Sequence, residues 1–254
     1  SGAGGLTADV LAISSAGAHA LAVVTGAYSR DTAEILDHFP FDEDAVAEQA
    51  RAALEDMPVS AIKVGFVGSP ENVSTIAEIA SDYADVPLIA YMPNLTWWDD
   101  SELESYLDAF RELMLPQATV LVGNHSTLWR WLLPDWSNER SPGPRDIARA
   151  AAEMGVPYVL VTGISQPDQH LESALATAHT VMLSERFERF DAIFGLDAVA
   201  RQPVDFAAGG AAIAADKLLG HCCSPARWLD GDDAHAASSR RARLAPMASS
   251  APVK

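Results

Sequence analysis

The regular alternation of short apolar runs with amphipathic helical patterns is the feature of this chain that most restricts its fold. Buried strands of a parallel sheet are near-continuous apolar runs, whereas surface helices repeat apolar residues every three or four positions. The alternation extends from residue 6 to residue 162. It predicts an α/β fold of three layers, in which a mainly parallel sheet is covered by helices on both faces.

The same pattern places the individual elements. Asp42 precedes an apolar-periodic stretch and is expected to cap the helix that follows, which Pro58 then ends. The expected helices are residues 6–16, 42–55, 70–83, 102–114 and 144–154. The expected strands are residues 21–25, 61–66, 87–91, 119–122 and 158–162.

The charge of the chain limits its partners. Of 254 residues, 35 are acidic and 17 are basic, which gives a formal net charge of −18 that repels nucleic acids and anionic membranes. Nothing resembles a secretion signal or a long apolar span, and the adjacent Cys222 and Cys223 suit neither an ordinary disulfide nor a spaced metal site. We therefore expect a cytoplasmic protein without a nucleic-acid or membrane partner.

The composition changes near residue 195. Residues 1–194 contain 29 acidic and 10 basic residues, whereas residues 195–254 contain 6 and 7. Residues 236–254 are rich in Ser, Arg and Pro and offer little apolar area to offset the entropy of ordering, so we expect disorder there. The sequence therefore divides into a domain at 1–194, a divergent segment at 195–235 and a tail at 236–254.

Loops with glycine or polar residues follow the expected strands. In parallel sheets ligands bind at the carboxyl ends of the strands, where such loops gather. The loops are residues 26–32, 65–69, 92–94, 123–124 and 163–165. A single glycine-rich run is weak evidence of function, so their order along the chain matters more than any one of them.

Five motifs occur in a fixed order along residues 1–194. They are the glycine-rich turn 1–9, the segment 23–32, the pair 56–59 and 63–69, Leu115-Pro116 with Gly123-Asn124, and the segment 158–163. Together they resemble the hydroxymethylpyrimidine/phosphomethylpyrimidine kinases of thiamine biosynthesis, which belong to the ribokinase-like superfamily. The resemblance implies phosphoryl transfer to an alcohol group, ATP and Mg²⁺ as cofactors, a small pyrimidine as substrate, and a homo-oligomer.

The resemblance implies a substrate site on the early loops. Gly2, Gly4 and Gly5 would let backbone N–H groups approach the pyrimidine, although a plain loop is the alternative. Gly65 and Phe66 stand where the family has a small residue and an apolar wall against the ring.

Two charged residues, Arg30 and Asp9, leave the identity of the substrate and part of its site undecided. Arg30 stands where the family commonly has a glutamine that binds the aminopyrimidine, and arginine only donates hydrogen bonds. A pyridoxal-type kinase is therefore the first alternative, since pyridoxal is also a hydroxymethyl heteroaromatic. Asp9 is either a site carboxylate or a solvated residue of the first helical turn.

On the nucleotide side the resemblance implies roles for Asn124, Thr162 and Gly163 near the phosphates, with an asparagine turn as the alternative for Asn124. Lys63 is either a phosphate contact or a surface charge at a strand end. The family's Asp-Pro after the fourth strand is Met92-Pro93 here, which removes a carboxylate near the magnesium ion, so no metal ligand is assigned.

The family's catalytic segment, Gly-x-Gly-Asp or Gly-Thr-Gly-Cys at a helix start, is not found where it is due after Phe194. That segment supplies the general base and an anion hole for phosphoryl transfer. Asp197 is a candidate base that lacks the second glycine, and Gly209-Gly210 is a candidate turn in which Ala211 stands where the base is due. The third interpretation is a frame change in the coding DNA, which we favour because the composition changes at the same place. We expect impaired catalysis, and a non-catalytic small-molecule binder is the alternative from a different functional class.

Two further expectations concern assembly and the sheet. Trp97-Trp98 and residues 128–136 are interpreted as a subunit interface in preference to a stacking platform. The family has a strand before the glycine-rich turn that this sequence does not show, and we expect a gap in the sheet at that place.

Overall fold

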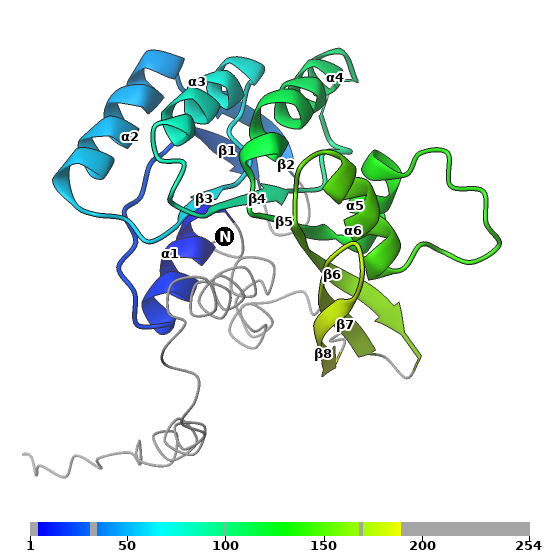
Figure 1. The fold of residues 1–254 in the computed structure, drawn as a ribbon. Coiled ribbons are helices and arrows are strands. Elements are labelled where there is room, and N and C mark those ends of the chain that lie inside the picture. Colours follow the sequence, from blue (N-terminus) through cyan, green and yellow to red (C-terminus); the bar gives the residue numbers. More distant parts are fainter. Residues whose placement is uncertain (1–4, 31–34, 99, 168–169, 189–254) are drawn as a thin grey trace, which may run out of the picture. The chain divides into compact units, whose positions relative to one another are not determined.

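The first strands of the main sheet are parallel, as the alternation predicts. The computed structural model describes residues 5–30, 35–98, 100–167 and 170–188 (Figure 1). Its six-stranded sheet has the order β3-β4-β5-β6-β7-β8. The parallel strands are β3 (Ile62–Val64), β4 (Leu88–Met92), β5 (Val120–Asn124) and β6 (Tyr158–Gln166). β7 (His170–Ala176) and β8 (Val181–Glu188) extend the sheet in antiparallel orientation.

Helices cover the sheet, and those from α3 to α6 connect its parallel strands. They are α1 (Leu6–Ser15), α2 (Glu43–Asp56), α3 (Pro70–Ser81), α4 (Asp100–Ala109), α5 (His125–Leu132) and α6 (Pro144–Glu153). In Figure 1, α2, α3 and α4 lie above the β3–β4 part of the sheet and α1 lies below it. Asp42 caps α2 as predicted, because its carboxylate accepts a hydrogen bond from the Asp44 amide at 3.1 Å.

The helix expected at residues 102–114 contains a change of pitch. α4 ends at Ala109 and continues as the π-helix Phe110–Met114, which is followed by the 3₁₀ turn Leu115–Gln117. Tyr106, Phe110 and Met114 from this segment are fully buried and belong to the core cluster between sheet and helices. Apolar periodicity marks the buried face of such a segment but does not distinguish a single π turn from regular α-helix.

The predicted strand at residues 21–25 is wrong. These residues have irregular conformation, and among the described residues they pair with no strand. The backbone of Val24 instead binds one side chain: its amide donates to Gln49 Oε1 at 3.2 Å and its carbonyl accepts from Gln49 Nε2 at 3.1 Å. An apolar run becomes a strand only where a neighbouring backbone supplies the ladder, and here the Gln49 amide group takes that place.

A separate hairpin follows this irregular segment. β1 (Gly26–Arg30) and β2 (Ile35–Pro40) pair antiparallel with each other and form a two-stranded sheet of their own. The sequence pattern did not predict this hairpin, and it also missed α5, β7 and β8. Segments 195–235 and 236–254, which composition separates from the domain, lie outside the described residues.

The parallel pairing brings the predicted loops to one edge of the sheet. The loop after β3 begins at Gly65, and Gly123-Asn124 ends β5, so the expectation that both lie at the carboxyl edge is confirmed. Among the described helices, none combines the length and apolarity that crossing a bilayer requires.

Candidate functional site

A cluster of six ring side chains lies beside the carboxyl end of β3, against the β1–β2 hairpin. This ring cluster consists of Tyr28 and His38 from the hairpin, Phe66 from the loop after β3, and Trp97, Trp98 and Tyr106. Tyr28 stacks on Phe66 with ring centroids 5.7 Å apart. Phe66 also meets Trp97 at 5.6 Å and Trp98 at 5.1 Å in edge-to-face geometry. Phe66 is therefore the centre of the cluster, as expected of an apolar wall.

Gly65 leaves open space beside Phe66. A Cβ atom placed on Gly65 would meet no atom within 4 Å. Gly65 is not among the glycines with positive φ, so its backbone does not demand glycine. Because Gly65 has no side chain, there is open space beside Phe66, the residue that the family resemblance places against the substrate ring.

β1 supplies two polar residues to consider here, of which Tyr28 stacks directly on Phe66. Burial against the ring cluster raises the pKa of the Tyr28 hydroxyl, and the positive charge of Arg30 only partly opposes the shift. Tyr28 therefore remains a protonated hydrogen-bond donor at neutral pH. Arg30 is exposed at the end of β1.

Asp9 and Lys63, both assigned to the site from sequence, form an ion pair with each other. Asp9 lies in the first turn of α1 and Lys63 in β3, and their side chains are only 17% and 14% exposed. The Lys63 ammonium also lies 5.5 Å from the centre of the Tyr91 ring. Asp9 is therefore not a solvated helix residue, and Lys63 is not a free surface charge. A phosphate contact by Lys63 stays a prediction.

Asn124, Thr162 and Gly163 meet at the ends of β5 and β6. Asn124 is opposite Thr162 in the parallel register, and its Oδ1 accepts from the Ser126 amide at 3.0 Å and thereby caps α5. Gly163 has φ of 66°, and a Cβ atom there would lie 2.2 Å from Asn124 Nδ2. Glycine is required at this position for both its left-handed backbone and the close approach of Asn124.

The two groups of predicted residues stand on either side of β4. The ring cluster, Gly65 and the Asp9–Lys63 pair belong to β3 and its neighbours, whereas Asn124, Thr162 and Gly163 belong to β5 and β6. One strand separates β3 from β5, so at about 4.8 Å per strand spacing these two strands are about 10 Å apart. Within the described ranges, no three His, Cys, Asp or Glu side chains gather as a metal site.

Several outcomes concern residues outside these groups. Gly2, Gly4 and Asp197 lie outside the described residues, whereas Gly5 precedes α1 with φ of 68°. Sequence reasoning missed His38 and Tyr106, because neither belongs to a motif. Trp98 is only 8% exposed, so most of its surface is used within this chain and not at a subunit interface.

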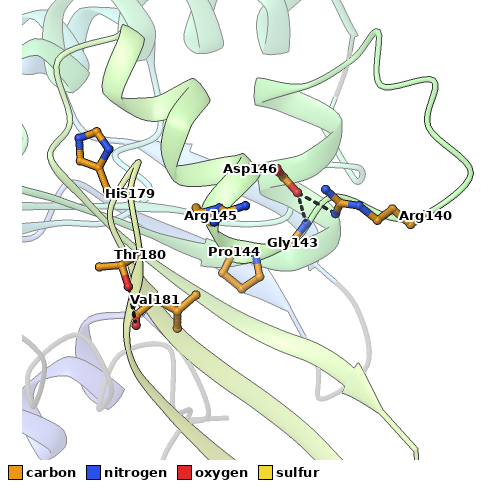
Figure 2. A pocket seen from close by; sticks show the side chains of 8 residues that line it. All are labelled: Arg140, Gly143, Pro144, Arg145, Asp146, His179, Thr180 and Val181. Carbon is orange, nitrogen blue, oxygen red and sulfur yellow. Dashed lines mark hydrogen bonds and ion pairs between the residues drawn. The ribbon is translucent and has the colours of Figure 1, made fainter.

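A hollow lies at the start of α6, apart from these groups (Figure 2). Its volume is about 360 Å³, and it is lined by Arg140, Gly143, Pro144, Arg145, Asp146, His179, Thr180 and Val181. Asp146 accepts from the Gly143 amide at 2.9 Å and pairs with Arg140 at 2.8 Å. The hydrogen bond from Arg140 is the main cause that lowers the pKa of Asp146. No residue assigned to the site from sequence lines this hollow.

Comparison with known proteins identifies relatives of the domain. The family described as phosphomethylpyrimidine kinase matches residues 1–191. A hydroxymethylpyrimidine/phosphomethylpyrimidine kinase of Streptomyces coelicolor is 27% identical over 166 residues, which cover 64% of this chain and 60% of the relative. The enzyme of the same name from Mycobacterium tuberculosis is 30% identical over 168 residues, which cover 64% and 59%. The chain thus spans about three fifths of the length of these relatives.

Solved structures share the fold. The ADP complex of Bacillus subtilis pyridoxal kinase has a TM-score of 0.67 at 19% identity and covers 85% of this chain and 80% of that chain. Phosphomethylpyrimidine kinase from Clostridium difficile has a TM-score of 0.61 at 17% identity, with coverages of 85% and 94%. Pyridoxal kinase from Staphylococcus aureus in complex with AMP-PCP and pyridoxal has a TM-score of 0.63 at 18% identity, with coverages of 85% and 76%. These identities are low, so the likeness establishes the α/β fold alone.

Proposed function

This chain belongs to the phosphomethylpyrimidine kinase family, and we propose that it binds hydroxymethylpyrimidine or its monophosphate as the acceptor of a phosphoryl group from ATP. The observation that carries the proposal is the open space at Gly65 beside Phe66. A planar heteroaromatic ring fits an apolar space next to a ring wall, and polar groups at its border orient it. Tyr28, which stacks on Phe66, and Arg30, at the end of β1, would do so.

The nucleotide would lie on the other side of β4. Because Asn124 Oδ1 accepts hydrogen bonds from Ser126, its Nδ2 group is the part of the side chain left to donate to a phosphate. Gly163 has no side chain and so admits the Asn124 side chain at the end of β6, which would hold Nδ2 at this edge of the sheet. The complexes of the two pyridoxal kinases with ADP and AMP-PCP support ATP as the phosphoryl donor.

Magnesium, the second expected cofactor, has no assigned ligands. Met92 takes the place of a carboxylate at the end of β4, and the described residues form no cluster of metal-binding side chains. These residues do not fit a protein-bound Mg²⁺ ion, whose preferred ligands are carboxylate and other oxygens.

Catalysis requires a base for the substrate hydroxyl and donors for the migrating phosphoryl group. Asp197 is the base candidate that the sequence offers, and the second glycine of the family's anion hole is missing beside it. We therefore propose that binding is retained more fully than phosphoryl transfer. A cytoplasmic location and self-association remain predictions.

Pyridoxal is the second candidate substrate, and Arg30 is the observation that favours it. A guanidinium donates hydrogen bonds and carries positive charge, so it suits the phenolate oxygen of pyridoxal better than the exocyclic amine of the pyrimidine. Both rings would use the same space at Gly65. The choice between them therefore depends on polar contacts and not on shape.

Calorimetry with both compounds tests the proposal. We expect heat of binding for hydroxymethylpyrimidine and weaker binding of pyridoxal, measured on the full chain. A preference for pyridoxal would replace the substrate, and no heat with either compound would contradict the proposed function. An ATP-consumption assay on the same samples then separates a kinase from a non-catalytic binder.

A further inference from the structure

A fully buried amide side chain joins the base of the hairpin to the loop after β3. Asn72, in the first turn of α3, has no exposed surface. Its Nδ2 donates to the Phe41 carbonyl at 3.1 Å and to the Val67 carbonyl at 2.9 Å. Phe41 directly follows β2, and Val67 directly follows Phe66. One side chain therefore joins the residue that follows β2 to the backbone of the loop after β3.

The orientation of this amide group is set by its neighbours. Both groups within hydrogen-bond distance of the side-chain nitrogen are carbonyl oxygens, which only accept, so the nitrogen and not Oδ1 must face them. Oδ1 itself is buried and has no partner among the described residues. A buried acceptor without a partner destabilises the fold. The two hydrogen bonds that Nδ2 donates therefore offset the free energy lost by burying Oδ1 unpaired.

Other contacts join the same two segments. His38 Nε2 lies 3.0 Å from the Gly68 carbonyl and donates to it, because a carbonyl oxygen only accepts. The Phe41 amide donates to the Thr25 carbonyl at 2.9 Å and so closes the base of the hairpin. Pro40 packs closely against Gly68, since a Cβ atom on Gly68 would lie 2.9 Å from Pro40 Cβ. Asn72 is the fully buried member of this set.

We propose that Asn72 is a positioning residue, which holds the β1–β2 hairpin against the β3–α3 loop and thereby keeps Tyr28 stacked on Phe66 at the ring-binding space. The link is direct along β1 and β2, because Tyr28 is opposite His38 in the hairpin register. The carbonyl groups that Asn72 binds belong to Phe41 and Val67, which are not among the residues assigned to the substrate, so its effect on the substrate would pass through the hairpin and the loop after β3. The statement about ligand affinity rests on the proposed function, whereas the statement about the hairpin does not.

The variant Asn72→Asp tests this role with almost unchanged size. A carboxylate has no hydrogen to donate, and a buried acid that takes up a proton has only one, so at least one carbonyl group loses its donor and faces an oxygen atom. Hydrogen exchange of the full chain should show exchange of hairpin amides in residues 26–40 faster by about tenfold or more, as expected from the loss of a buried hydrogen bond that leaves its acceptor unpaired. The affinity for hydroxymethylpyrimidine, measured by calorimetry, should fall by a similar factor.

Matched variants separate positioning from general loss of stability. Val73→Ala changes the next residue of α3, which is also fully buried but donates no side-chain hydrogen bond. It should leave the ratio of hairpin exchange to β5 exchange, and the affinity for hydroxymethylpyrimidine, unchanged. His38→Phe keeps a ring but removes the bond to Gly68, and should act in the same direction as Asn72→Asp. It also keeps the test usable should Asn72→Asp fail to fold.

The outcomes are distinct. Faster exchange in the hairpin with unchanged exchange in β5 supports the proposal. The proposal is overturned if Asn72→Asp and His38→Phe accelerate hydrogen exchange equally in the hairpin and in β5. It is also overturned if neither variant accelerates exchange in the hairpin. A wild-type chain that does not bind hydroxymethylpyrimidine overturns the proposed function alone, because the exchange experiment needs no ligand.

Discussion

Phe66 gains its position from contacts on several sides, and this restricts what the neighbouring residues can be. Tyr28, Trp97 and Trp98 each bring a ring to within 6 Å of the Phe66 ring centre. Such ring pairs contribute about 0.5–1.5 kcal/mol each beyond the burial of their surface. The wall beside Gly65 is therefore rigid, and added volume at Gly65 cannot be accommodated by moving it.

Gly65→Val should weaken the binding of hydroxymethylpyrimidine without loss of stability. The new side chain has open space and an ordinary backbone conformation, so it takes only the room intended for the ligand. One extra methylene in a pocket changes binding by about 10–200-fold, and we expect a loss in that range by calorimetry. Gly143→Ala, at a site whose nearest atom is 3.7 Å away, is the control and should bind normally. Equal affinity of Gly65→Val and wild type would place the ligand elsewhere.

The Asp9–Lys63 pair should show strong coupling in a double-mutant cycle. Both side chains are mostly buried, so removing one charge leaves the other without its partner. We expect Asp9→Asn or Lys63→Gln alone to lower the free energy of unfolding in urea by about 1–3 kcal/mol, less than the 3–5 kcal/mol typical of fully buried pairs. The double variant should regain part of this loss. Strictly additive losses would show that the two side chains do not interact.

Helix ends are the elements whose stability depends most directly on single polar groups. The carboxylate of Asp146 accepts from the Gly143 amide and is paired with Arg140, and its side chain is only 11% exposed. The carboxylate therefore stabilises the first turn of α6 in two ways. The Asp108–Arg111 pair, by contrast, has side chains that are 56% and 39% exposed.

Asp146→Ala should cost about 1 kcal/mol of unfolding free energy at pH 7, the usual value of a helix cap. Because the pKa of Asp146 is lowered in the folded state, this stabilisation is present above its unfolded pKa of about 3.9 and is lost as the pH falls through the lower folded value. The difference between wild type and variant should therefore shrink in acid, measured by urea unfolding from pH 7 to pH 3. Asp108→Ala should change little at any pH. A difference independent of pH would contradict the role of the charge.

The elements show where sequence patterns succeed and where they fail. Asp42 was predictable as a cap because a local rule connects its side chain to an amide two residues away. The conformation of Val24 was not predictable, because its partner Gln49 is 25 residues away on α2. The β1–β2 hairpin has no two-residue Asn-Gly or Asp-Gly turn, so the strongest short-range hairpin signal was missing.

For the whole molecule, the sheet edge was predictable and the ring cluster was not. Parallel topology alone brings Gly65 and Asn124 to one edge, so the pattern was sufficient to place them. His38 from the hairpin and Tyr106 from α4 contact Phe66 through tertiary packing, which hydrophobic periodicity does not predict. The ion pair of Asp9 with Lys63 likewise joins residues 54 positions apart.

The chain should transfer the phosphoryl group of ATP slowly. Removing one oxyanion-type donor typically costs about 10²–10³ in rate, and losing a general base costs roughly 10²–10⁴, with partial overlap between the two. A variant that carries the family's Gly-x-Gly-Asp helix from residue 195 onward should consume ATP much faster with hydroxymethylpyrimidine. Comparable turnover of both proteins would show that the present sequence supplies a base, and Asp197→Asn would then test whether Asp197 is that base.

The neighbouring indoles of Trp97 and Trp98 give the ring cluster an optical property. Their planes are inclined by only 14° and their centres are 6.0 Å apart, so their electronic transitions couple. Near-ultraviolet circular dichroism, which depends on fixed packing of aromatic groups, should therefore contain a large contribution from this pair. A ring placed beside Phe66 would change the surroundings of Trp97, so the protein carries a label-free chromophore that reports occupancy of its own candidate site.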